Sequence, residues 1–552
     1  MAMSAGLEDA DSARKGWSTQ MSATTAPSGM AKGEAADDRG AVAIARVASG
    51  SVANLLGAAV AAACVFGLTI ILTRGLAQDQ AGVFFAATSV FLLLSTLSQL
   101  GTGTGLVYFV SRSRALGRRT DISAYLRTAI RPVLWVSLVA SLALFVLSPT
   151  VARLVTPDQV DTTTTYLRAL SLFVPFAALE NVLLAATRGM GTMRANVLVE
   201  QVGRPLLQLV LVGAVVLLGL PGVSVAWAFG YLPAMVVAWL WCRRRVTGAG
   251  NRPEPGASPK RREIAGAFWR FTLPRTATSI IQVLMQRFDI VLVAALAGVR
   301  EAAIYAAATR FVVAGQIGTG AISSAAQPQL GRLIALGDRA ATNAIYQTAT
   351  GWLMMVTWPI FLIFLCFQQT LLGVFGEGYS AGSSVMILMS LAMLVATGFG
   401  MVDMVLAMAG RTTWNLMNAL VAVTVTIGLD LWLIPTHGVL GAAVGWAAGI
   451  VCQNTLALSQ VGLSLRLHPF GRMTATVAGL AVSCFLLLPL LVRSLMGQAV
   501  PALVVASLSA MLIYLPALWM LRRRLHLDQL PFTRLVRRTR GQLRSGDTGQ
   551  QQ

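Results

Sequence analysis

Charged residues are scarce in this sequence. Lys, Arg, Asp and Glu make up 12% of its 552 residues, whereas 56% are hydrophobic, and the mean hydropathy is +0.69. A soluble chain of this length carries roughly twice that charged fraction. Apolar runs also recur from about residue 50 to about residue 520. The composition therefore excludes an ordinary soluble protein and predicts an all-α protein that crosses a membrane many times.

Histidine and cysteine are also rare. The chain has three histidines and five cysteines, and no spacing among them suits a metal site or a redox pair. The sequence contains no Ser/His/Asp set and no phosphate-binding glycine loop. We therefore expect no metal, no cofactor and no enzymatic activity, and we expect the cysteines to fill small apolar spaces.

The net charge of +21 follows the membrane rather than one soluble face. We divide the apolar region into fourteen predicted spans of about twenty residues each, centred near residues 62, 92, 138, 175, 207, 233, 283, 316, 360, 395, 423, 450, 481 and 510. Only five of the 43 Lys and Arg then lie in the loops of one side, namely Arg74, Arg153, Arg168, Arg300 and Arg493. By the positive-inside rule this side is the outer one, so both termini are predicted to be cytoplasmic. The pattern argues against nucleic-acid binding.

A basic, Pro- and Gly-containing stretch at 242–263 is the longest hydrophilic stretch inside the apolar region. Six predicted spans precede it and eight follow, so it marks a boundary between two lobes. The predicted segments are a disordered tail (1–46), an N-lobe (47–244), a linker (245–264), a C-lobe (265–462), spans thirteen and fourteen (463–521) and a basic cytoplasmic tail (522–552). The last tail suits anionic lipid headgroups.

The two lobes resemble each other in sequence. AGVFFAAT at 81–88 aligns with AAIYAAAT at 302–309, an offset of 221 residues. At an offset of 219, the N-lobe residues Gly191, Asn196, Gly219, Gly222, Trp227 and Ala228 meet Gly410, Asn415, Gly438, Gly441, Trp446 and Ala447. Because each lobe has six predicted spans, the repeats would share one orientation. We expect a pseudo-two-fold axis along the membrane normal and a cavity between the lobes.

A short motif joins the first two predicted spans. Its members are Arg74, Asp79, Gln80, Gly82 and Phe84. With its surroundings at 71–112, this motif resembles the opening of bacterial polysaccharide and oligosaccharide flippases of the O-antigen and teichoic-acid exporter type. Those flippases belong to a superfamily that also contains multidrug extruders and lipid II flippases.

The resemblance extends over roughly residues 48–465. The segment from Pro274 through Asp289 to Tyr305 is similar to the start of the family's second lobe, although AAIY replaces a Gly-containing turn often seen there. Fourteen spans suit the flippase branches better than the twelve-span drug extruders. The resemblance implies translocation of a polyprenyl-diphosphate-linked glycan from the cytoplasmic to the outer leaflet of a bacterial plasma membrane.

Nine charged residues lie within the predicted spans. They are Arg204, Arg275, Arg287, Arg310, Glu180, Glu200, Asp289, Asp403 and Asp430. A charge in mid-bilayer costs ~2.5–3.5 kcal/mol on insertion scales, so it usually pairs, faces the bundle interior or lines a wet cavity. Glu180, Glu200 and Asp403 are expected toward the cytoplasmic side and Asp430 near the outer edge, which leaves the middle cationic if the arginines point inward.

Depth along the helices predicts partners in the C-lobe. Asp289 lies about 12 Å below the outer end of its span, and Arg310 reaches the same depth on the next span. We therefore predict an Asp289–Arg310 pair. Residues two apart on a helix face roughly opposite sides, so Arg287 is left as an uncompensated cation.

The N-lobe charges also predict a cluster. Glu200 and Arg204 are four residues apart, the favourable order for an ion pair along one helix face. Glu180 reaches about the depth of Glu200, and two facing carboxylates can share a proton. The alternative is that all three form a structural polar cluster that ties helices together.

Arg204, Arg275, Arg287 and Arg310 are the expected substrate contacts. A diphosphate is negatively charged, and arginine offers planar, bidentate donors that suit it. Arg275 has an alternative role, because it follows Pro274 near the cytoplasmic end and can extend to the interface.

The sequence predicts a flippase that works by alternating access, functions as a monomer, and binds a lipid-linked glycan and membrane lipids. Coupling to H⁺, Na⁺ or the membrane potential would use Glu180, Glu200 or Asp403. One alternative is a drug–cation antiporter of the same superfamily, which would have acids and aromatics in its cavity. A membrane glycan polymerase or ligase would need a long outer loop, and every predicted outer loop is short. A non-transporting scaffold is the remaining alternative.

Overall fold

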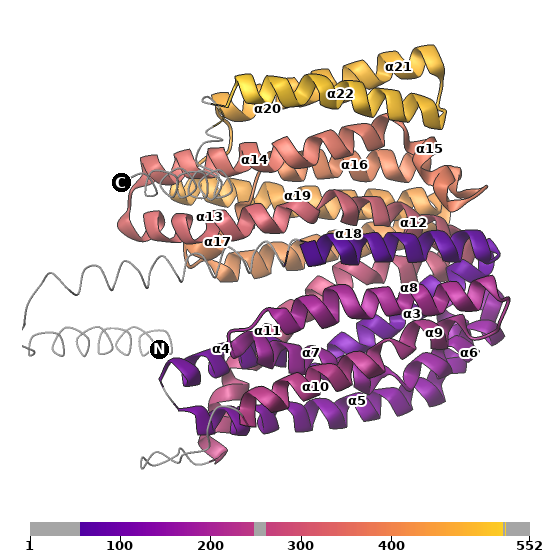
Figure 1. Cartoon of the computed structure of the whole chain (residues 1–552), viewed down its shortest axis with the longest axis vertical. Helices are drawn as coiled ribbons and strands as arrows, with labels where there is room; N and C mark the ends of the chain where they lie inside the picture. The colour runs from indigo at the N-terminus through magenta and orange to yellow at the C-terminus, as the bar shows by residue number, and fades with distance from the viewer. Residues whose placement is uncertain (1–53, 55, 117, 248–260, 523–524, 526–552) are drawn as a thin grey trace, which may run out of the picture. The chain divides into compact units, whose positions relative to one another are not determined.

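The computed structural model describes residues 54, 56–116, 118–247, 261–522 and 525. Within these residues the regular structure is helical throughout, as predicted (Figure 1). The predicted N-terminal tail, most of the linker and almost all of the basic C-terminal tail lie outside the described residues.

The N-lobe begins with a helix at Leu56–Gly75. The elements that follow are α3 (Gln78–Ser98), α4 (Thr102–Ala115), α5 (Arg119–Val155), η1 (Pro157–Gln159), α6 (Val160–Ser171), α7 (Val174–Gly189), the π-helix η2 (Asn196–Gly203), α8 (Arg204–Leu217), α9 (Val223–Phe229) and α10 (Tyr231–Thr247). The stretch that includes α6 bends by 44° at the break before α7. Pro175 directly follows this break, where the missing N–H of proline costs no helical hydrogen bond.

The C-lobe and the C-terminal helices make up the rest of the described chain. The C-lobe elements are α11 (Arg261–Leu296), α12 (Val299–Gly315), α13 (Ile317–Leu336), α14 (Arg339–Cys366), α15 (Gln368–Leu372), η3 (Gly373–Phe375), η4 (Tyr379–Gly382), α16 (Ser383–Gly398), α17 (Val402–Met408), α18 (Thr412–His437) and α19 (Val439–Leu465). The C-terminal elements are α20 (Arg472–Val482), η5 (Ser483–Leu487), α21 (Leu488–Met496) and α22 (Val500–Met520).

The protein is a multi-pass membrane protein. In the part of the chain that is described, 11 helices are long and apolar enough to cross a membrane, or up to 12 when the bent α6–α7 pair is one span. The predicted seventh and eighth spans fall on α11 and on α12 with α13, which are not among these candidates. The total of fourteen spans therefore stays a prediction.

Two glycine pairs support the duplication of the lobes. Gly191 and Gly410, at the predicted offset of 219, have φ angles of 78° and 76°. Gly219 and Gly438, at the same offset, have φ angles of 63° and 56°. Few residues other than glycine adopt this left-handed region. The aligned glycines therefore share a backbone requirement, which chance matches of a common residue would not explain.

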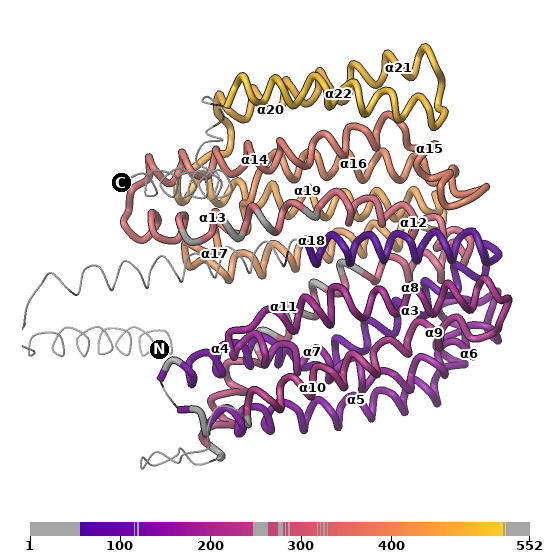
Figure 2. The backbone as a smooth tube through the Cα atoms, in the orientation of Figure 1, coloured from indigo at the N-terminus to yellow at the C-terminus, as the bar shows by residue number. Residues whose placement is uncertain are grey.

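The long helix α11 joins the lobes (Figure 2). Its first half packs against α4 and α5, with Phe271 stacked on Tyr108 at 4.4 Å between ring centroids. Thr276 donates a hydrogen bond to the carbonyl of Leu100 (2.8 Å). Helix α11 also packs against α12 and α18, which belong to the C-lobe. One helix thus contributes to both lobes.

Helices α20 to α22 lie outside the repeat and pack against α14 (Figure 1). Tyr514 donates a hydrogen bond to the carbonyl of Met355 (3.0 Å), and Arg493 donates one to the carbonyl of Cys366 (2.8 Å). Leu512 and Met520 on α22 are largely exposed. An apolar face of this kind suits contact with lipid.

Candidate functional site

The charged residues predicted within the N-lobe spans meet between α7, η2 and α8. Glu180 on α7 is fully buried and accepts a hydrogen bond from Nη1 of Arg204 (3.0 Å). The Arg204 guanidinium also lies over the ring of Tyr231, 4.8 Å from its centroid. A buried carboxylate needs such a partner, because an uncompensated charge away from water is very costly.

The predicted Glu200–Arg204 ion pair is wrong. Glu200 instead lies 3.6 Å from Nη1 of Arg188, which also donates a hydrogen bond to the side chain of Asn196. The spacing rule ignored partners on other elements: Arg204 reaches Glu180 on α7 and lies over the ring of Tyr231, while Glu200, on the π-helix Asn196–Gly203, lies within reach of Arg188.

Glu180, Glu200 and Arg204 nevertheless form one polar cluster, as the sequence predicted. Glu200 is close enough to influence both Glu180 and Arg204 electrostatically. Within the described structure, Oε1 of Glu180 and Nε of Arg204 have no hydrogen-bond partner. Arg204 therefore has one buried N–H donor that no described residue accepts.

Arg287 and Arg310 bring further positive charge to this region. Arg287 on α11 is close enough to Arg310 on α12, and to Tyr231, to influence both electrostatically. The Arg310 guanidinium lies 5.9 Å from the centroid of Phe85 on α3. Neither arginine forms an ion pair with any residue that the structure describes. Arg287 is thus near Arg310, and both Arg287 and Arg204 are near Tyr231; we call these three arginines the arginine cluster.

The predicted Asp289–Arg310 pair is also wrong. Oδ2 of Asp289 accepts a hydrogen bond from the hydroxyl of Tyr305 (3.0 Å). The depth argument ignored direction around the helix: Tyr305 and Arg310 are five residues apart on α12, which turns them about 140° from each other. Tyr305 faces α11, whereas Arg310 faces Phe85.

Asp430 on α18 lies beside Asp289 rather than at the outer edge, where the sequence placed it. Its side chain is fully buried, and neither carboxylate oxygen has a hydrogen-bond partner among the described residues. Asp289 and Asp430 are close enough to influence each other, and both influence Tyr305. Two carboxylates and a tyrosine therefore form a second polar centre in the C-lobe, which we call the carboxylate pair.

Asp403 takes no part in either group. Its carboxylate accepts a hydrogen bond from Nε2 of Gln453 (3.3 Å), and its main-chain carbonyl accepts one from Nδ2 of Asn415 (2.7 Å). These contacts join α17, α18 and α19. The side chain of Arg275 lies outside the described residues, so its predicted contact with substrate stays a prediction.

Sequence reasoning missed Tyr231, Tyr305 and the position of Asp430. Tyrosine is compatible with a span, so hydropathy gives no sign of either residue. The one available signal for Tyr305 was its place in the repeat, where it aligns with Phe84. The described residues contain no group of His, Cys, Asp and Glu that could hold a metal ion.

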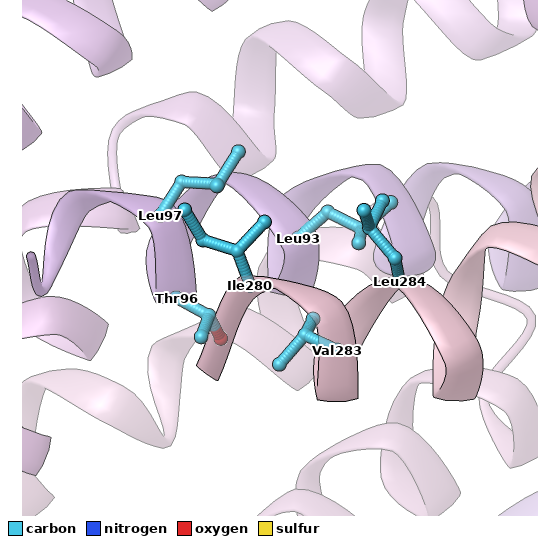
Figure 3. Close-up of a pocket in the computed structure, with 6 residues that line it drawn as sticks. All are labelled: Leu93, Thr96, Leu97, Ile280, Val283 and Leu284. Carbon is cyan, nitrogen blue, oxygen red and sulfur yellow. The ribbon is translucent and has the colours of Figure 1, made fainter. Parts of the chain in front are cut away.

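A small pocket lies between α3 and α11 (Figure 3). It is lined by Leu93, Thr96, Leu97, Ile280, Val283 and Leu284. No lining residue is charged, so this pocket offers nothing to an anionic headgroup. The arginine cluster remains the candidate site for a charged ligand.

A family model described as "Polysaccharide biosynthesis protein" matches residues 47–334. A search of curated proteins found no significant match. Among solved structures, the chain is similar to the lipid II flippase MurJ in an inward closed conformation, with 13% identity, a TM-score of 0.65 and coverage of 86% of this chain and 99% of that one. It is also similar to a multidrug resistance MATE family transporter in an inward-facing conformation, with 16% identity, a TM-score of 0.61 and coverage of 73% and 94%.

A transporter from Pyrococcus furiosus, described as having a binding pocket of reverse polarity, is similar with 16% identity and a TM-score of 0.53. This similarity covers 76% of this chain and 95% of that one. At these identities the likeness establishes the fold, and the fold is that of MATE and MurJ transporters.

Proposed function

The chain belongs to the family of polysaccharide biosynthesis proteins, and we propose that it is a flippase for a polyprenyl-diphosphate-linked oligosaccharide. In this proposal the headgroup moves from the cytoplasmic to the outer leaflet while the prenyl chain stays in lipid. The observation that carries the proposal is the arginine cluster. Its three guanidinium groups come from α8, α11 and α12.

The charge balance of the cluster suits a diphosphate. Glu180 compensates Arg204, while Arg287 and Arg310 have no acidic partner among the described residues. Unpaired charges inside a membrane protein are costly, so those that are present usually have a function. A diphosphate would compensate them, and arginine can hold its oxygens in a bidentate manner. A free glycan without phosphate would leave both cations unpaired.

The contacts of α11 support alternating access. Arg287 and the carboxylate Asp289 both lie on this helix, which packs against α4 and α5 of the N-lobe and against α18 of the C-lobe. A bound headgroup would therefore lie where the two lobes share an element. Movement of one lobe against the other would change access to the arginine cluster from the two sides.

The carboxylate pair is the best-supported place for a coupling cation. Two buried carboxylates close together are costly unless a proton or a cation compensates one of them. Arg310 and Tyr305 lie on the same helix, α12, so a change at the carboxylate pair can reach the arginine cluster through that helix. Among the carriers expected from the sequence, Glu180 has a cationic partner at 3.0 Å and suits this role less well.

A drug–cation antiporter is the second candidate, and the similarity to a MATE transporter fits it equally well. The electrostatics of the site disfavour it. A cationic drug near Arg287 and Arg310 would meet two positive charges that no described residue compensates.

Substitution of the arginine cluster tests the proposal. Arg204→Ala and Arg287→Ala are each expected to slow export of the lipid-linked glycan by about 10- to 100-fold, because a hydrogen bond to a charged group contributes about 1.5–3 kcal/mol. Arg→Lys variants should retain part of the activity, since they keep charge and lose the bidentate geometry. The measurement is the amount of lipid-linked oligosaccharide on the inner leaflet of cells that carry each variant as their only copy.

Arg332→Ala is the matched control, because Arg332 is exposed on α13 and belongs to neither polar centre. It should export at the wild-type rate. Wild-type export by both Arg204→Ala and Arg287→Ala, at normal expression, would exclude the arginine cluster as the headgroup site. Drug resistance on expression, with no effect on any lipid-linked glycan, would favour the antiporter.

A further inference from the structure

The two lobes are joined by an ion pair at the end of the helices that the positive-inside rule places outside. Nε of Arg300, in the first turn of α12, lies 3.0 Å from Oδ1 of Asp79, in the first turn of α3. Nη2 of Arg300 lies 3.4 Å from the other carboxylate oxygen. Helix α3 belongs to the N-lobe and α12 to the C-lobe, so this pair crosses the lobe boundary.

Asp79 and Arg300 are equivalent positions of the two repeats. They are 221 residues apart, which is the offset that aligns 81–88 with 302–309. In an object with two-fold symmetry, a position can contact its own equivalent only at the axis. The ion pair therefore marks the pseudo-two-fold axis at the predicted outer end.

The backbones also approach closely at this point. A Cβ atom on Gly82 would lie 1.8 Å from the carbonyl oxygen of Val299, far inside van der Waals contact. Only glycine allows α3 and α12 to come this close. The motif residue Gly82 therefore has a specific task in this arrangement, as does its neighbour Asp79.

Arg74, the first residue of the same motif, makes a second connection. Its Nε donates to the carbonyl of Val374 (2.8 Å) and its Nη2 to the carbonyl of Gly373 (3.0 Å). Deeper along the same helix, the ring of Phe66 contacts those of Phe311 and Phe375, both at 5.2 Å between centroids. The helix Leu56–Gly75 is thus fastened to the C-lobe at its outer end.

Among the described residues, the inner ends of the helices have fewer polar contacts between the lobes than the outer ends. Of the side-chain hydrogen bonds described between the N-lobe and residues 261–465, only the bond from Thr276 to Leu100 lies away from the outer end. Thr276 is on α11, the helix that already belongs to both lobes. The polar connections between the lobes are therefore concentrated at the predicted outer end.

We propose that Asp79, Arg300, Arg74 and Gly82 form an outer gate that closes the inter-lobe region on the extracytoplasmic side. The gate opens when Asp79 and Arg300 separate, and only then can a headgroup leave outward. This inference rests on the proposed function for the nature of the group released. The existence of the gate does not depend on which group that is.

The exposure of the pair suits a gate. The side chains of Arg300 and Asp79 are 66% and 39% exposed, so water competes for both charges and the pair opens at small cost. Its position on the axis means that an equal outward movement of both lobes separates the two charges directly. A buried pair in the same place would resist such opening.

Hydrogen exchange measured by mass spectrometry on the full-length protein in lipid nanodiscs tests the gate. Arg300→Glu places two like charges on the axis and should open the outer end. Amide exchange in segments 78–86 and 299–306 is expected to become about two- to fivefold faster, the range that corresponds to a partly exposed ion pair. The reversed pair, Asp79→Arg with Arg300→Asp, restores the attraction and should return exchange to the wild-type rate.

Arg153→Glu is the control. Arg153 is exposed in the last turn of α5, at the same end of the molecule, and its substitution reverses the same charge as Arg300→Glu. It should leave both segments unchanged. Equal exchange in Arg300→Glu and Arg153→Glu would overturn the gate, as would failure of the reversed pair to slow exchange. The readout needs no substrate, so the gate can stand or fall independently of the flippase proposal.

Discussion

Glu180 shows at the scale of one residue why charges within the membrane are so constrained. Its carboxylate is fully buried and has one described partner, Arg204, at 3.0 Å. Arg204 in turn depends on Glu180, because the other carboxylate near it, Glu200, pairs with Arg188. Removing either partner leaves an uncompensated charge, whereas removing both leaves an apolar contact.

Glu180→Ala is therefore expected to lower the free energy of unfolding by about 3–5 kcal/mol. The double variant Glu180→Leu with Arg204→Met should be less destabilised than Glu180→Ala, since no buried charge remains unpaired. Thermal unfolding of the purified protein in detergent measures both effects. A double variant less stable than the single one would show that the pair contributes net stability rather than only mutual compensation.

The charged residues inside the apolar runs could be identified from the sequence, whereas their partners could not. A charge within an apolar run is visible in the sequence, and this found Glu180, Arg204, Arg287, Asp289 and Arg310. Pairing depends on direction around each helix, and small local changes alter it. Glu200 lies closest to Arg188 on another helix, and the five-residue spacing of Tyr305 and Arg310 on α12 turns Arg310 away from Asp289. No pattern of hydropathy contains that information.

At the scale of elements, glycine sets how closely α18 and α19 pack around the carboxylate pair. A Cβ atom on Gly445 would lie 2.0 Å from Oδ1 of Asp430 and 3.1 Å from the carbonyl of Thr426. A Cβ atom on Gly449 would lie 2.0 Å from Oγ1 of Thr426. Small residues of this kind let membrane helices approach closely. They hold Asp430 against α19 and away from lipid.

Gly445→Ala should force α18 and α19 apart and lower the free energy of unfolding by about 1–3 kcal/mol, as overpacking usually does. Gly462→Ala is the control on the same helix, because nothing lies within 4 Å of a Cβ atom there. It should be neutral or stabilising by up to about 1 kcal/mol, the helix-propensity difference between alanine and glycine. Thermal unfolding compares the two variants, and equal stability would show that α18 and α19 can separate at no cost.

At the scale of the whole molecule, the close contact at Gly82 sets the balance between the closed and the open state of the proposed gate. Helices α3 and α12 correspond in the predicted repeats and pack against each other, so their separation would report on the state of the proposed gate. The offsets in the sequence predict which positions of the two lobes correspond. The contact between Asp79 and its equivalent Arg300 could not be predicted in this way, because a repeat specifies which positions correspond and leaves open which of them touch.

Gly82→Ala therefore tests the balance of states. Its methyl group would lie 1.8 Å from the carbonyl oxygen of Val299, and a backbone atom cannot rotate away as a side chain can. The state with its outer end closed should lose about 1–3 kcal/mol, which shifts the closed-to-open ratio by about 5- to 150-fold. Spin labels at exposed positions Asp161 and Glu377, at the predicted outer ends of the two lobes, should report the change as a longer distance distribution.

Gly67→Ala provides the comparison on the neighbouring helix, because a Cβ atom there would lie at an ordinary 3.5 Å from Leu209. It should leave the distance distribution unchanged. A gate biased open should also slow export, since the headgroup site would return less often to the state that faces the cytoplasm. An unchanged distance distribution in Gly82→Ala would mean that α3 and α12 are already apart in the dominant state. The close contact of Gly82 with Val299 would then belong to a minor state.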